Sequence, residues 1–131
     1  MDLKAILSGI DVNADWVGLR YVKENTGFRL VRDCKPEANT RESKQGIMVE
    51  VLVNGQFAYY GTSRLDAPGI QAAADQAVAL AKAASKFSLY SFGLEARPKA
   101  KGSFRSAFKN AADAISPGEL SNLLIKATNE L

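Results

Sequence analysis

Two β-type runs in the middle of the chain are joined by the dipeptide Asn54-Gly55. The first run is Ile47-Met-Val-Glu-Val-Leu-Val53, and the second is Gln56-Phe-Ala-Tyr-Tyr60. A two-residue Asn-Gly loop favours a type I′ turn, because both residues adopt positive φ at little cost. Such a turn fixes the register, so we expect a β-hairpin in which the last residue of the first run faces the first residue of the second.

An alanine-rich helix is predicted directly after this hairpin. Asp66 is a suitable N-cap, and Pro68 falls in the first turn, where its missing N–H costs nothing. Apolar residues then recur at helical spacing as far as about Lys86. They are Ile70, Ala73, Ala74, Ala77, Val78, Leu80, Ala81 and Ala84. A stripe of small side chains lets a helix lie close against a sheet, so we interpret it as core packing.

Further strands are predicted on both sides of the hairpin. Residues 16–22 and 28–34 are rich in β-forming residues and are separated by a turn signal at Thr26-Gly27. Residues 87–92 have the same character. The polar residues 35–46 are interpreted as a loop that includes part of an extended edge strand, because Lys and Glu protect an open sheet edge.

Three more helical patterns complete the fold prediction. Residues 2–8 are amphipathic, and Ser116-Pro-Gly-Glu119 is a capping box that begins a helix running to Leu131. A weaker stripe comprises Phe104, Phe108, Ala111, Ala112 and Ile115. The order of elements predicts an α+β fold, with a mixed, mostly antiparallel sheet of about four strands and helices packed on one face.

The chain contains no histidine and one cysteine, Cys34. The lack of histidine excludes Ser-His-Asp and Cys-His catalysis, and zinc sites of the HExxH and Cys2His2 types. A single cysteine excludes an internal disulfide and fits a reducing compartment. Cys34 itself is interpreted as a small, half-buried strand residue. No apolar run approaches the ~18 residues of a membrane helix, and residues 1–8 are no signal peptide, so we expect a cytoplasmic protein.

The net charge of +3 comes from the second half of the chain. Five basic residues follow one another there without an intervening acid: Arg97, Lys99, Lys101, Arg105 and Lys109. Phe104 and Phe108 lie among them, and clustered cations with aromatic rings are typical of a nucleic-acid contact. The simpler interpretation is a solvated segment between two ordered parts, because one short run on a balanced chain is a weak electrostatic signal.

Carboxylate chemistry is a further hypothesis. Glu24, Asp33, Glu37 and Glu42 are available, but their spacing predicts no facing pair of the kind that glycoside hydrolysis needs. We interpret these four side chains as solvated turn and edge residues.

Residues 12–86 resemble the N-terminal domain of the TldD/PmbA family, whose members are also described as modulators of DNA gyrase. Four pieces carry the resemblance in order: Ala14-Asp-Trp-Val-Gly-Leu-Arg20, Gly46-Ile-Met-Val-Glu-Val-Leu-Val-Asn-Gly55, Gln56-Phe-Ala-Tyr-Tyr-Gly-Thr-Ser63, and Ala72 to Ala84. Glu50 and Asn54 replace the Arg and Asp of the family's hairpin, and both changes preserve the turn chemistry.

The resemblance implies a piece of a protease. Family members are similar to two-domain zinc metalloproteases, whose C-terminal domain holds an HExxxH helix and a later cysteine as metal ligands. Without histidine, this chain has no position for those imidazoles, so we expect no cofactor here and zinc in the C-terminal domain of a full-length parent. The implied partners are a homologous TldD/PmbA-type subunit and unfolded peptides, whereas nucleic acid and membranes are not expected.

The expected organisation is a TldD/PmbA-like domain over residues 1–92. Residues 93–131 are expected to form a basic loop and a helix that leads toward an absent C-terminal domain. The implied function is a non-catalytic domain that shapes the substrate chamber and the subunit assembly. The alternative is a stand-alone module that binds nucleic acid or protein through residues 97–109. Whether the parent is TldD-like or PmbA-like stays open.

Overall fold

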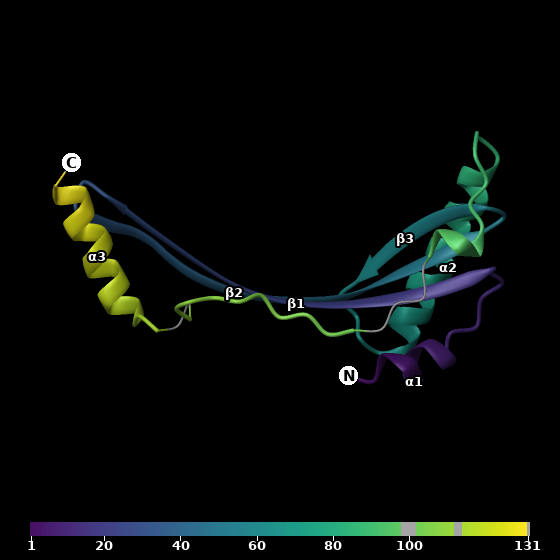
Figure 1. Ribbon diagram of the computed structural model, residues 1–131, viewed down its shortest axis with the longest axis horizontal. Helices are drawn as coiled ribbons and strands as arrows, with labels where there is room; N and C mark the ends of the chain where they lie inside the picture. The colour runs from purple at the N-terminus through teal and green to yellow at the C-terminus, as the bar shows by residue number, and fades with distance from the viewer. Residues whose placement is uncertain (98–101, 112–113, 131) are drawn as a thin grey trace. The chain divides into compact units, whose positions relative to one another are not determined.

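The computed structural model describes residues 1–97, 102–111 and 114–130 (Figure 1). In chain order, the elements are α1 (Leu3–Ser8), β1 (Trp16–Arg32), β2 (Lys35–Val53), β3 (Gln56–Thr62), α2 (Ala67–Ser85), η1 (Leu94–Ala96) and α3 (Pro117–Asn129). The chain divides into two compact units. Unit 1 comprises Met1–Glu24 and Lys44–Lys99, and unit 2 comprises Asn25–Ser43 and Ala100–Leu131.

The sheet is open and has the strand order β1-β2-β3. Between β2 and β3 the chain reverses through Asn54 and Gly55, whose φ angles are 50° and 75°, and Val53 lies opposite Gln56. Between β1 and β2 it reverses through Asp33 and Cys34, whose φ angles are 47° and 60°. The fold class is therefore α+β, with three antiparallel strands among the described residues instead of about four.

The core of unit 1 lies between α2 and one face of the sheet (Figure 1). Alternate residues of β2 point toward α2, and the small side chains of α2 let the helix approach closely. The buried residues are Ile47, Val49, Val51, Val53, Ala58, Ile70, Ala73, Ala74, Ala77, Val78 and Ala81. The helix predicted after Asp66 is confirmed, and the Asp66 carboxylate accepts the Gly69 amide at 2.7 Å. Leu80 and Ala84, which the stripe included, are exposed.

Helix α1 and the residues that follow it pack against the same core. Leu3, Ile6 and Ile10 are partly buried there. Asp2 caps α1 by accepting two backbone amides, and the helix predicted over residues 2–8 is present as Leu3–Ser8. The Asp11 amide donates to the Gln71 side chain at 3.0 Å, and the Gln71 amide group donates back to the Asp11 carbonyl at 2.8 Å. These two bonds attach the N-terminal segment to the first turns of α2.

Three predictions about strands are wrong. The Thr26-Gly27 turn is absent, because β1 continues through it as one strand. The polar residues 35–46, which were expected to be strand only in part, all belong to β2, where pairing with β1 outweighs their weak β-propensity. Residues 87–92 form no strand. They meet the sheet at one backbone bond, from the Phe92 amide to the Gly55 carbonyl at 2.8 Å, and by aromatic contacts instead of a ladder.

Unit 2 contains the β1–β2 turn and α3, and none of its described residues is fully buried. Cys34 lies in the turn, not in a strand, and its thiol donates to Asn129 Oδ1 across 3.6 Å. The helix predicted from Phe104 to Ile115 is not present in the described part of that stretch, and Ala112 lies outside the described residues. Phe104 is 90% exposed, so this stripe has no apolar surface against which to fold.

The capping box of α3 is confirmed. The Ser116 amide donates to Glu119 Oε2 at 2.9 Å, and the Glu119 amide donates to Ser116 Oγ at 3.2 Å. Hydrogen bonds from the Ser116 side chain and then from its backbone lower the pKa of the Glu119 carboxyl below its ordinary value. Because the pKa of Glu119 is lower in the folded state than in the unfolded state, its ionised carboxylate stabilises the fold at pH values above the unfolded pKa. This stabilisation is lost as the pH falls through the folded pKa.

We therefore expect the first turn of α3 to fray in acid. Glu119→Gln keeps a side chain that completes a capping box but removes the titration. In an NMR titration from neutral pH to about pH 3, the Cα shifts of residues 117–120 should move toward coil values in the native chain. They should stay constant in Glu119→Gln. Equal shifts in both chains would show that another group causes the change.

Candidate functional site

The face of the sheet opposite α2 carries a polar pocket in unit 1. The β2–β3 register places Glu50 beside Tyr59 and Leu52 beside Phe57 on this face, because side chains of paired residues lie on the same side of a sheet. The pocket has a volume of about 420 Å³. It is lined by Trp16, Gly18, Leu19, Arg20, Met48, Glu50, Tyr59 and Arg97.

Arg97 is the cation in this pocket. Its guanidinium pairs with the Glu50 carboxylate and donates to the Tyr59 hydroxyl at 2.7 Å. The Arg97 Cζ atom lies 4.4 Å from the centroid of the Phe57 ring and 6.0 Å from that of Trp16. The Glu50 side chain is 20% exposed and that of Arg97 is 37% exposed, so water screens the pair only partly. The guanidinium is thus held by a carboxylate, a phenol and two rings.

Trp16 takes its position because residue 18 is glycine. A Cβ atom on Gly18 would lie 2.3 Å from the Trp16 ring, well inside van der Waals contact. The absence of that atom lets the indole lie over the β1 backbone, where it meets Phe57 edge-on with ring centroids 6.3 Å apart. The aromatic wall of the pocket is therefore built from the start of β1 and from β3.

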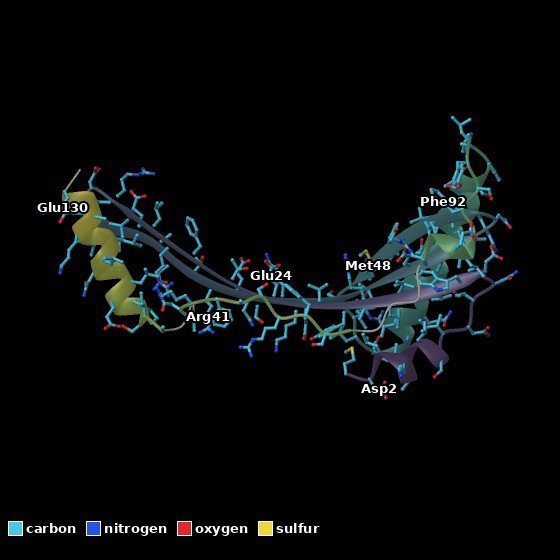
Figure 2. The ribbon with its side chains drawn as sticks, in the orientation of Figure 1. Asp2, Glu24, Arg41, Met48, Phe92 and Glu130 are labelled. Carbon is cyan, nitrogen blue, oxygen red and sulfur yellow. The ribbon has the colours of Figure 1, made fainter. Side chains whose placement is uncertain are left out.

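Arg97 reaches the pocket from the irregular chain that follows α2, which we call the 86–97 segment. Near its middle this segment is attached to the β2–β3 turn, where the Gln56 side chain donates to the Tyr90 carbonyl at 2.7 Å. The Phe92 ring packs on Phe57 with centroids 5.5 Å apart. Figure 2 labels Phe92 of this segment and Met48 of the sheet. Through these contacts the segment covers part of the sheet face opposite α2.

The five basic residues of the predicted contact do not act as one group. Arg97 belongs to unit 1 and is paired with Glu50, whereas Arg105 and Lys109 belong to unit 2. The Arg105 guanidinium lies 5.6 Å from the centroid of the Phe108 ring, and Lys109 is exposed. Lys99 and Lys101 lie outside the described residues. Glu50, Tyr59 and Trp16 were not predicted as site residues, although a lone acid in the apolar run 47–53 was a usable signal.

None of the four carboxylates considered for catalysis is among the residues that line this pocket. Asp33 is in the β1–β2 turn, and Glu37 pairs with Arg32 at 3.5 Å on the surface of unit 2. In the described parts of the chain, no three side chains of the metal-binding types gather in one place. Nor does any helix there combine the length and apolar character that crossing a bilayer requires.

Unit 2 has a hollow of its own, with a volume of about 500 Å³. Arg29 and Arg41 line it from β1 and β2, and Ser116, Pro117 and Leu120 line it from the start of α3. The capping box already occupies the amide groups at this helix end. The pocket of unit 1 combines more independent contacts around one charged group, and it is the stronger candidate.

Comparison with known protein families identifies a related domain. The model of the PmbA/TldA metallopeptidase domain 1 matches residues 17–81. The match extends from the second residue of β1 to the last core residue of α2, and it includes the sheet residues that line the pocket except Trp16. No curated protein and no solved structure matches the chain. The chain therefore belongs to the TldD/PmbA family and carries that family's N-terminal domain over residues 17–81.

Proposed function

We propose that this chain is a non-catalytic N-terminal domain of a TldD/PmbA-like metalloprotease, which shapes the substrate chamber and the subunit assembly in which unfolded peptides are degraded. The observation that carries the proposal is the coincidence of the family match with the sheet and its core helix. Residues 1–92 would supply this domain, and residues 93–131 would lead toward the catalytic domain. The proposed compartment is the cytoplasm.

The chemistry of the chain agrees with a supporting role. A zinc site of the family's type needs two imidazoles, and the sequence has no histidine with which to supply them. The residues of this chain therefore do not fit a zinc site of that type, and we assign the zinc of the proposed protease to its C-terminal domain. The pocket of unit 1 offers a carboxylate that is already paired with Arg97, which suits recognition better than proton transfer.

An open sheet edge gives the domain a way to hold an unfolded peptide. Within the described residues, no strand pairs with the outer edge of β3. Since Val53 and Gln56 close a two-residue turn, Gln56, Ala58 and Tyr60 bond to β2, and the backbone groups of Phe57, Tyr59 and Gly61 point outward. An extended peptide can add to such an edge by main-chain hydrogen bonds that depend little on its sequence.

Assembly with a zinc-bearing homologue tests the proposal. The chain is mixed at micromolar concentration with a TldD/PmbA-type subunit from the same genome, and the mixture is examined by native mass spectrometry. We expect a complex that contains both proteins, because the proposed domain forms part of the wall between subunits. The matched control is Ile70→Ala, which weakens the core without changing the surface charge. Absence of any complex with the native chain contradicts the assembly role.

A further inference from the structure

The pocket around Arg97 has the chemistry of an arginine-binding site. A guanidinium is planar and delocalised, so it can pair with a carboxylate in its plane and stack its faces on aromatic rings at the same time. Glu50 supplies the carboxylate, Tyr59 the hydroxyl acceptor, and Phe57 and Trp16 the rings. The ammonium group of lysine is less suited to pairing with a carboxylate and stacking on rings at the same time, because its charge is compact and strongly hydrated.

The walls of the pocket other than Arg97 are held in place by the sheet. Glu50, Tyr59 and Phe57 are fixed by the β2–β3 register, and Trp16 is fixed by its contact with Gly18 and Phe57. Arg97, in contrast, belongs to a segment that contributes no residue to the core cluster. Within that segment Phe87 is 85% exposed and Leu89 is fully exposed. Its attachment rests on the contacts at the β2–β3 turn and on Arg97 itself.

One wall of the pocket, Tyr59, belongs to the strand with the open edge. Tyr59 is one of the residues whose backbone groups point outward, and its side chain forms part of the pocket. A strand added to this edge would lie about 4.8 Å away, with alternate side chains on the pocket face. Glu50 lies on β2, one strand further from this edge, so an arginine side chain on the added strand would extend across Tyr59 to reach its carboxylate.

We propose that the pocket residues Trp16, Glu50 and Tyr59, with the neighbouring Phe57 ring, recognise the arginine side chain of an extended peptide, and that Arg97 pairs with Glu50 from within the chain until such a peptide replaces it. Only the peptide part rests on the proposed function, since the pocket itself can be tested with a small molecule. The 86–97 segment would then act as a built-in competitor that keeps the pocket closed to weak ligands.

The small-molecule test uses Arg97→Ala and the fluorescence of Trp16, which is the chain's single tryptophan. N-acetyl-arginine amide should change the emission saturably at millimolar concentration. N-acetyl-lysine amide should bind about fivefold more weakly or worse, and the native chain should bind the arginine amide about tenfold more weakly because Arg97 competes. The control is the double variant Glu50→Gln with Arg97→Ala. It should bind the arginine amide about tenfold more weakly than Arg97→Ala does.

Two outcomes overturn the pocket proposal. One is the absence of a saturable change with the arginine amide in Arg97→Ala. The other is equal binding of both amides in Arg97→Ala and in the double variant. If Arg97→Ala does not fold, Arg97→Lys replaces it, since this substitution keeps a cation beside Glu50. The arginine amide should then still shift the Trp16 emission, and the lysine amide should not.

The peptide test compares two ten-residue peptides of alternating polar and β-branched residues. One has a central arginine, and the other has citrulline, which is nearly isosteric and neutral. We expect the arginine peptide to bind about tenfold more tightly to the native chain, and this preference to vanish in Glu50→Gln. Equal binding of both peptides at the β3 edge overturns the inference while leaving the proposed function intact. Binding of neither peptide at that edge contradicts both.

Discussion

Replacing Ile70 by alanine should lower the free energy of unfolding by about 2–5 kcal/mol, the usual range for an isoleucine deleted from a packed core. Ile70 is 1% exposed and lies in the first turns of α2, against the sheet. A domain of this size has a total stability of about 5–15 kcal/mol, so the variant should lose a large part of it. Urea unfolding followed by circular dichroism measures the change.

Leu80→Ala is the matched control for this experiment. Leu80 lies on the same helix and is also a branched aliphatic residue, but it is 48% exposed. Its replacement should cost less than about 1 kcal/mol, because alanine has a better helix propensity and little apolar surface returns to water. Equal losses in the two variants would show that α2 does not pack on the sheet with the face containing Ile70.

Helix α2 was predictable because its signals are local. The cap at Asp66, the proline in the first turn and the alanine spacing all act within a few residues of one another. They identify the buried side of the helix, at Ala73, Ala77 and Ala81, before any tertiary contact is known. The capping box at Ser116 was predictable for the same reason.

The long course of β1 and β2 was not predictable from local signals. Residues 35–46 are polar and would favour a loop by themselves, yet they continue as β2 because β1 pairs with them. Pairing between strands depends on residues far apart in sequence, and it outweighs propensity. The turn at Asp33-Cys34 lacks the glycine that marked the other turn, so the predicted strand was extended to Cys34, two residues past the end of β1.

The candidate pocket was invisible for a related reason. Arg97 was grouped with Lys99 and Lys101 because they are neighbours in sequence, whereas its partner Glu50 lies 47 positions earlier. The register that places Glu50 beside Tyr59 follows from the Asn-Gly turn. What the sequence does not contain is a local signal that the chain after α2 returns across the opposite face of the sheet.

The second large effect concerns the amide groups of β3. If an unfolded peptide adds to the open edge, the outward amides of Phe57, Tyr59 and Gly61 become hydrogen-bonded. At a peptide concentration about ten times the Kd, their hydrogen exchange should slow by about tenfold. Ala58 and Tyr60 bond to β2 with or without peptide and serve as internal controls, since their exchange should change much less.

One measurement tests most directly whether this chain holds peptides without cutting them. An unfolded casein-derived peptide is added to the metal-stripped chain, amide exchange is followed by NMR, and the mass of the peptide is measured from the same sample. We predict protection at Phe57, Tyr59 and Gly61 with the peptide intact. Unchanged exchange at these three amides, or cleavage of the peptide by the purified chain alone, would contradict the account.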